Sequence, residues 1–191
     1  MNHLELAQEI KTRNMIEMAW GYATMTRVLL KGSGEPIVEQ LGRLFAGLEL
    51  IAEQKDYDAA HADFCDWFTR RIRTRRKKRS SYGHAAKVLD ISAKVYVYYC
   101  AQPSDDVARR LVPMLHGAVD TQIMKKLANL YPDAGVRSKT LHEVDLEEYK
   151  KLQRLVARDI EATFQSQIHP VQYDDIMWRT LNRPRVQNRP L

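Results

Sequence analysis

The sequence predicts an all-α protein that forms one domain over residues 1–182. Hydrophobic residues recur at helical spacing along almost the whole chain, and no segment alternates hydrophobic and polar residues as a half-buried strand does. The length of 191 residues fits one domain, with two small lobes separated by a cleft as the outer limit. Hydrophobic residues make up 45% of the chain and charged residues 28%, which indicates a folded core rather than disorder.

Hydrophobic stripes and helix breakers define four helices in the first half of the chain. The expected helices span about residues 15–29, 36–51, 58–72 and 84–101. Gly32-Ser33-Gly34 ends the first stripe, and Pro36 begins the second helix because the missing N–H of proline costs nothing in a first helical turn. The turn at residues 80–83 separates the third helix from the fourth.

The second half of the chain contains residues that commonly begin helices. The expected helices span residues 105–111, 121–131, 146–167 and 171–182, with a loop at residues 132–144. Ser104, Asp120 and Asp145 each stand directly before a hydrophobic pattern and are expected as N-caps. Glu148, three residues after Asp145, is expected to complete a capping box. Residues 183–191 are expected to form a flexible basic tail.

Several classes of protein are excluded by composition. Cys65 and Cys100 are too few for a disulfide framework, and they lack the CxxC spacing of a structural zinc module. The longest apolar run, residues 95–101, is too short to span a bilayer, and charged residues stand where a signal peptide needs an apolar core. We therefore expect a cytoplasmic protein with no membrane partner. The histidines lack ligand spacing and no glycine-rich phosphate loop is present, so neither a metal nor an organic cofactor is expected.

The positive charge of the chain is concentrated in one segment. The chain has 30 Lys and Arg against 24 Asp and Glu, and eight of the 30 lie within residues 70–79, which leaves 22 basic residues elsewhere. The electrostatic field of eight cations within ten residues favours a polyanionic partner that carries phosphate groups. A solvated helix end is the structural alternative, since basic residues also favour helix C-termini. Anionic lipid fits less well, because the run lacks an interleaved apolar face.

Two lysines share one face of the fourth expected helix. Lys87 and Lys94 are seven residues apart, which is close to two helical turns, and hydrophobic residues surround both. A desolvated lysine has a lowered pKa, and its neutral amine can attack a carbon centre. In the alternative interpretation, Lys94 forms an ordinary i,i+4 pair with Asp90 and Lys87 faces solvent.

Two further carboxylates are candidates for a site. Asp120 stands before a helix, where it can be an N-cap or a carboxylate aimed into a cleft. Asp174 and Trp178 are four residues apart on one helical face, and a carboxylate beside an indole can bind and stack on a nucleic-acid base. The alternative is a core tryptophan beside a solvated acid.

In order and spacing, these motifs resemble the archaeal 8-oxoguanine DNA glycosylases, a divergent branch of the helix-hairpin-helix DNA glycosylases. In that family two lysines seven residues apart are followed about thirty residues later by an aspartate, and a late His-Pro helix carries Asp and Trp. The matching segments here are residues 87–94, Ala118–Asp120 and His169–Trp178. With the basic run, the resemblance covers a little over half of the chain. It implies a helix-hairpin-helix DNA glycosylase-like helical bundle.

The resemblance also implies a reaction, namely excision of a base with β-lyase activity. Lys87 is expected to attack the sugar C1′ of a flipped nucleotide and form a Schiff base. Asp120 is expected to orient and deprotonate that lysine and to stabilise positive charge on the sugar. The residues expected around the base are Lys94, Asp174 and Trp178, with Trp67 and Trp20 as further walls.

The expected partner is double-stranded DNA that contains a damaged or modified base, with no obligate protein partner. The residues expected to contact DNA are Arg73, Arg75, Arg76, Lys77, Lys78, Arg79, Ser80, Ser81, Tyr82, Gly83 and His84. The family places a base-reading glutamine before a Gly-x-Gly-Glu stretch, but here residues 29–31 before Gly32 contain none. This departure argues against 8-oxoguanine itself and leaves a modified base of phage DNA as an equal candidate.

Two other functions fit the same sequence. A non-catalytic helical protein could bind nucleic acid through residues 70–79, with Lys87 and Asp120 in structural roles. An interaction module could instead use the basic run to bind an acidic protein. The first alternative predicts DNA binding that survives loss of Lys87, and the second predicts no preference for DNA over other polyanions.

Overall fold

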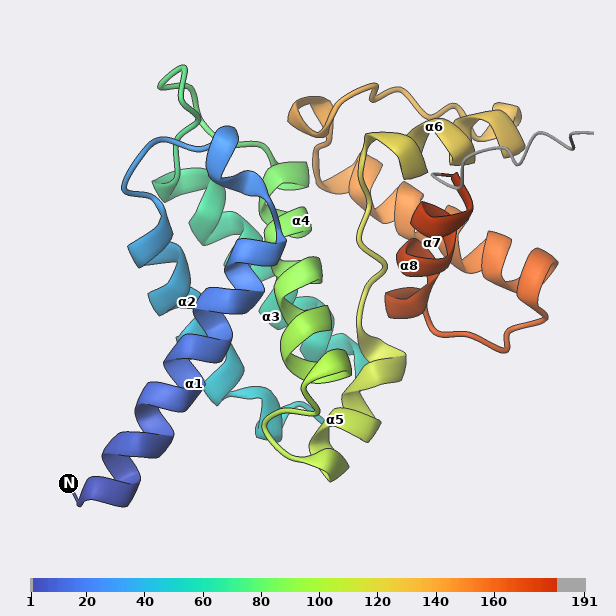
Figure 1. The fold of residues 1–191 in the computed structure, drawn as a ribbon. Helices are drawn as coiled ribbons and strands as arrows, with labels where there is room; N and C mark the ends of the chain where they lie inside the picture. Colours follow the sequence, from blue (N-terminus) through green and yellow to red (C-terminus); the bar gives the residue numbers. More distant parts are fainter. Residues whose placement is uncertain (1, 182–191) are drawn as a thin grey trace, which may run out of the picture.

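The protein is described by a computed structural model over residues 2–181 (Figure 1). The α-helices are α1 (His3–Tyr22), α2 (Gly34–Ala46), α3 (Gln54–Arg71), α4 (Tyr82–Ala93), α5 (Asp105–Leu111), α6 (Thr121–Leu130), α7 (Leu146–Phe164) and α8 (Pro170–Leu181). Apart from two isolated bridges, residues 2–181 contain no β-structure, so the prediction of an all-α fold is confirmed. The predicted tail, residues 183–191, lies outside the described residues.

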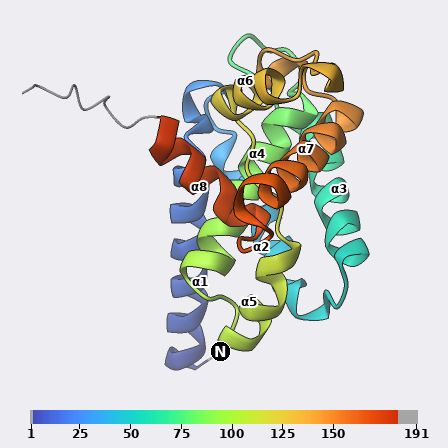
Figure 2. The ribbon, with the colours of Figure 1, turned by 90° about the vertical axis from the view of Figure 1, so that its right-hand side faces the viewer.

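The helices form two groups around one core. Figure 1 shows α1–α5 on one side and α6–α8 on the other, and in Figure 2 the second group lies in front of α4. One continuous cluster of buried hydrophobic side chains runs through both groups, from Ile16 on α1 to Met177 on α8. Within the described residues, no helix is long and apolar enough to cross a membrane.

Local capping fixes the start of three helices as the sequence predicts. Ser104, Asp120 and Asp145 each accept a hydrogen bond from a backbone N–H in the first turn of α5, α6 and α7 respectively. These hydrogen bonds satisfy donors that have no partner within the helix. The three predicted N-caps are therefore confirmed.

Glu148 does not complete the predicted capping box with Asp145. Its buried carboxylate accepts hydrogen bonds from the backbone N–H groups of Arg137 at 2.6 Å and Ser138 at 3.2 Å, and it pairs with Lys151 at 3.1 Å. Burial alone would raise the pKa of Glu148, but these partners lower it below its ordinary value. The side chain therefore anchors the loop before α7 instead of capping the helix.

Several helix boundaries differ from the hydrophobic pattern, most clearly those of α1 and α4. α1 begins at His3, because Asn2 and Glu5 form a capping box well before the apolar stripe. The predicted helix 84–101 is α-helical only to Ala93 and continues as a π-helical segment, Lys94–Tyr99. Such segments often occur at functional sites.

Candidate functional site

A hairpin of residues 72–81 carries most of the basic run. The backbones of Arg73 and Arg79 form a bridge, and the N–H of Thr74 donates to the Lys78 carbonyl at 2.9 Å. The hairpin is also tied to residues 28–30, where two backbone hydrogen bonds of 2.9 Å join it. Figure 1 shows it as the green loop that projects at the top of the molecule. Its backbone is thus fixed while its tip faces solvent.

Among residues 2–181, the exposed cations of the hairpin have no carboxylate partner. Within the described part of the chain, no ion pair involves the side chains of Arg75, Arg76, Lys77, Lys78 and Arg79, all of which are exposed. By contrast, Arg70 pairs with Asp66 at the end of α3, and Arg73 donates to backbone carbonyls. The predicted cationic patch is therefore centred on residues 75–79.

The end of the hairpin and the first residues of α4 are packed against residues 141–144. Residues 80–84, predicted to contact DNA, are buried or half-buried. A Cβ atom at Gly83 would lie 2.6 Å from the carbonyl oxygen of Leu141, and the Gly83 N–H donates to the Val144 carbonyl at 3.0 Å. Ser81 caps α4 and also donates to Leu141. Residues 141–144 therefore cover this stretch in part, and the stretch is much less exposed than the hairpin tip.

Lys94 and Asp174 contact each other although they are 80 residues apart. The buried Lys94 Nζ lies 2.5 Å from Asp174 Oδ2 and 2.8 Å from Asp175 Oδ1. Asp175 also accepts a hydrogen bond from the Tyr99 hydroxyl. These contacts join the π-helical segment to α8, so two residues expected in one pocket do lie together.

The Lys94–Asp174 pair has perturbed protonation equilibria. Burial opposes the charge of Lys94, but the two carboxylates raise its pKa above the ordinary value. Burial raises the pKa of Asp174 to about 6, despite the opposing effect of Lys94. Asp174 Oδ1 is buried and has no hydrogen-bond partner within the described residues. One turn further along α8, the side chain of Trp178 is 58% exposed and lies at the surface.

Lys87 and Asp120 do not touch in this conformation. Lys87 is half-buried on α4, two turns before Lys94, and its side chain makes no hydrogen bond or ion pair within residues 2–181. Asp120 is half-buried, and its Oδ1 accepts hydrogen bonds of 2.9 Å from the N–H groups of Gln122 and Ile123. Its second oxygen makes no hydrogen bond in the described part of the chain.

Of the remaining predicted pocket residues, Trp20 lies in the core and the half-buried Trp67 packs against it. Trp20 is 8% exposed, and Trp67 packs against Phe64 and Phe68 with ring centroids 5.8 and 6.3 Å away. Neither indole makes a cation–π contact with Lys94 within the described residues. The two side chains therefore stabilise the packing of the first helical group.

The structure also brings together a set of residues that sequence reasoning missed. We call His61, Asp90, His116 and Tyr149 the histidine cluster. His61 Nε2 lies 2.9 Å from Asp90 Oδ1, and the Tyr149 hydroxyl lies 3.1 Å from His61 Nε2 and 3.0 Å from His116 Nδ1. Atoms of the two histidines and Asp90 lie within 4.8 Å of one another, close enough to hold a metal ion. The alternative Asp90–Lys94 pair is wrong, because Asp90 faces this cluster.

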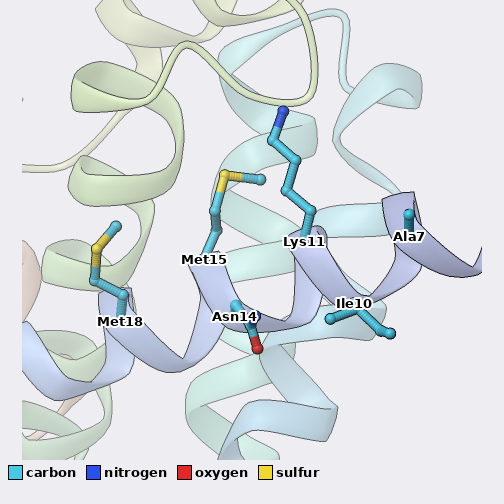
Figure 3. Close-up of a pocket in the computed structure, with 6 residues that line it drawn as sticks. All are labelled: Ala7, Ile10, Lys11, Asn14, Met15 and Met18. Carbon is cyan, nitrogen blue, oxygen red and sulfur yellow. The ribbon is translucent and has the colours of Figure 1, made fainter.

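Two hollows on the described surface lie away from the predicted pocket. One of about 390 Å³ runs along α1 (Figure 3). Its lining residues are Ala7, Ile10, Lys11, Asn14, Met15 and Met18. A second, of about 290 Å³, is lined by residues of the 137–145 loop. Neither is lined by Lys87, Lys94, Asp120 or Asp174.

Comparison with protein-family models, with curated proteins and with solved structures gives no match for this chain. Function is therefore inferred from the chain's own residues. The features that bear on function are the exposed cationic hairpin, the Lys94–Asp174 contact and the half-buried Lys87 on α4, seven residues before Lys94.

Proposed function

We propose that the protein is a DNA glycosylase of helix-hairpin-helix type with β-lyase activity, acting on a damaged or modified base in duplex DNA. The observation that supports this most is the contact between Lys94 and Asp174. The resemblance to archaeal 8-oxoguanine DNA glycosylases assigns these two residues to one base pocket, although they lie on different helices. Lys87, the expected nucleophile, lies two turns before Lys94 on α4.

The cationic hairpin would hold the DNA backbone. Its exposed cations lack carboxylate partners in the described residues, so phosphate groups can bind them without displacing an ion pair. Because residues 80–84 are buried or half-buried against residues 141–144, residues 75–79 would make the contact with DNA. This contact would fix the duplex close to the first turn of α4.

The proposed reaction begins with attack of the Lys87 amine on the sugar C1′. The new C1′–N bond forms as the bond to the base breaks, and the base leaves with that electron pair and takes up a proton. Asp120 would accept the proton that Lys87 loses, through the carboxylate oxygen that does not cap α6. Opening of the sugar then gives the Schiff base, from which β-elimination breaks the bond to the 3′ phosphate.

Binding of a base would rearrange the Lys94–Asp174 pair. A flipped base can accept a hydrogen bond from Lys94 and donate one to Asp174, which replaces the direct contact between them. The unpaired Oδ1 of Asp174 provides an acceptor for this purpose. The exposed indole of Trp178 offers a stacking surface one turn away.

Borohydride trapping on duplexes with different modified bases tests this proposal. We expect a covalent protein–DNA band for one class of base with the wild type and none with Lys87→Gln. Lys125→Gln is the matched control, since Lys125 is exposed on α6 and should leave the band unchanged. The absence of any adduct, even with an abasic duplex, would overturn the lyase mechanism.

The separation of Lys87 from Asp120 favours a second candidate, a helical protein that binds nucleic acid without catalysis. Asp120 already has a structural role as the N-cap of α6. This candidate requires salt-sensitive DNA binding that is equal in wild type and Lys87→Gln, with no trapped adduct in either. The same set of reactions therefore distinguishes the two functions.

A further inference from the structure

The histidine cluster brings side chains from four parts of the fold to one point. His61 lies on α3, Asp90 on α4, His116 on the segment between α5 and α6, and Tyr149 on α7. His61, Asp90 and Tyr149 are almost completely buried, whereas the side chain of His116 is 18% exposed. The cluster is therefore a buried polar centre with an opening at His116.

The histidine cluster contains too few hydrogen-bond donors for the acceptor atoms that lie within hydrogen-bond distance. His116 Nε2 lies 3.0 Å from Asp58 Oδ1, and an ionised carboxylate only accepts, so Nε2 carries a hydrogen. In neutral His116, Nδ1 is then a bare acceptor 3.0 Å from the Tyr149 hydroxyl. That hydroxyl also lies 2.9 Å from Asp90 Oδ2. Its single proton can serve His116 or Asp90, but not both.

A cation at this point removes the conflict. If a metal ion takes the lone pair of His116 Nδ1, the Tyr149 proton is free to donate to Asp90 Oδ2. His61 Nε2 and Asp90 Oδ1 would be the other ligands, and they already lie 2.9 Å apart. A tetrahedral Zn²⁺ with bonds of about 2.0 Å separates its ligand atoms by about 3.3 Å. The ligand atoms here lie within 4.8 Å of one another, so binding requires the side chains to adjust and the Tyr149 hydroxyl to leave the lone pair of His116 Nδ1.

The surroundings of both histidines fit metal ligation. A metal-bound histidine usually donates its other ring N–H to a carboxylate or another acceptor, which fixes its orientation. His116 Nε2 faces Asp58 at 3.0 Å, and His61 Nδ1 faces the Tyr82 hydroxyl at 3.4 Å. Two imidazoles with one carboxylate form a donor set that Zn²⁺ prefers.

We propose that His61, Asp90 and His116, with Tyr149 beside them, bind one divalent transition-metal ion, with Zn²⁺ as the preferred ion. The ion would join α3 and α4 to the segment between α5 and α6, and the Tyr149 hydroxyl on α7 would donate to Asp90 beside it. Asp90 lies three residues after Lys87, and His116 lies four residues before Asp120. The proposed role of the ion is structural, and metal binding can be tested without relying on the proposed glycosylase reaction.

Metal binding is measured directly on the full-length chain. We expect about one Zn²⁺ per chain after dialysis against Zn²⁺, and visible absorption bands of tetrahedral Co²⁺ when the chelator-treated protein is titrated with Co²⁺. His116→Gln should bind at least about a hundredfold more weakly, because it removes a ligand from the partly exposed edge of the site. His169→Gln, at an exposed histidine, should bind as the wild type does.

A stability measurement accompanies the titration. Removal of Zn²⁺ should lower the Tm of the wild type and of His169→Gln, but not that of His116→Gln. A folded wild-type chain with no bound ion and no Co²⁺ bands would overturn the proposal. In that case a protonated His116, visible by NMR, would satisfy the Tyr149 and Asp90 contacts instead.

Discussion

In the first turn of α4, Gly83 and His84 pack against residues 141–144. The carbonyl oxygen of Leu141 lies where a Cβ of residue 83 would project, and His84 is 6% exposed. His84 Nδ1 accepts the N–H of Ser81 at 3.3 Å, which requires that this nitrogen carry no proton. Burial first, and then the nearby charges of His142 and Lys87, lower the pKa of His84 to about 4.

The lowered pKa of His84 makes the protein less stable in mild acid. The unfolded chain takes up a proton at this histidine below pH 6.5, whereas the folded chain does so only near pH 4. The free energy of unfolding therefore falls as the pH falls from 6.5 to 4 and levels off below that. In urea unfolding at several pH values, His84→Asn should lose this part of the pH dependence. An unchanged slope in the variant would contradict the assignment.

Gly83→Ala should destabilise the protein because of the close approach of Leu141 and Val144. The new Cβ would lie 2.6 Å from the Leu141 carbonyl oxygen and 2.7 Å from the Val144 Cβ, and neither can move away as a flexible side-chain tip could. We expect a loss of about 2 kcal/mol or more in the free energy of unfolding. Gly21→Ala is the control, since no atom lies within 4 Å of its Cβ position. There, alanine should be neutral or stabilising.

At the scale of elements, the basic run of residues 70–79 divides into two parts with different roles. Its first residues end α3, where Arg70 pairs with Asp66. The rest form the hairpin, in which the backbone is held by residues 28–30 and the tip residues 75–79 remain exposed. The number of basic residues predicts a binding surface. Only the backbone hydrogen bonds of the hairpin show which of these residues form that surface.

Neutralising two hairpin arginines should weaken DNA binding in a salt-dependent way. Arg76→Gln with Arg79→Gln removes two cations, so the slope of log K against log salt should decrease by about 2. Arg109→Gln with Arg110→Gln gives the same change in charge on α5, which lies at the opposite end of the molecule (Figure 1), and should leave the slope nearly unchanged. Equal effects of the two double variants would indicate attraction to overall charge rather than binding at the hairpin.

Elements set by local chemistry were predictable, whereas contacts between distant segments were not. Asp120 and Asp145 cap helices because an N-cap needs only the residues beside it. Glu148 leaves its predicted capping role because Arg137 and Ser138, which precede it by about ten residues, present backbone donors to it. The sequence alone gives no measure of such competition between local and tertiary partners.

Across the whole molecule, two buried polar centres connect the helical groups. The histidine cluster joins α3 and α4 to α7, and the Lys94 ion pairs join the π-helical segment to α8. Only the second was predictable, and it came from the resemblance, because periodicity alone favoured an Asp90–Lys94 pair. The histidine cluster gave no signal, because its members come from four segments without regular spacing.

Loss of Lys94 should cost more stability at neutral pH than in mild acid. Lys94→Met leaves Asp174 and Asp175 facing each other, with side chains only 15% and 33% exposed, which should cost about 3 kcal/mol near pH 7.5. The folded-state pKa of Asp174 is already raised to about 6 and rises further without Lys94. The folded variant therefore takes up a proton as the pH falls through this range, and part of the lost stability returns at pH 5.

Asp174→Asn provides the matched comparison for Lys94→Met. In this variant Lys94 keeps its 2.8 Å contact with Asp175, so the buried cation stays paired and the loss should be smaller. Urea unfolding of both variants at pH 7.5 and pH 5 measures the difference. An equal loss for Lys94→Met at the two pH values, or a larger loss for Asp174→Asn, would show that the ion pair does not hold α8 against the π-helical segment.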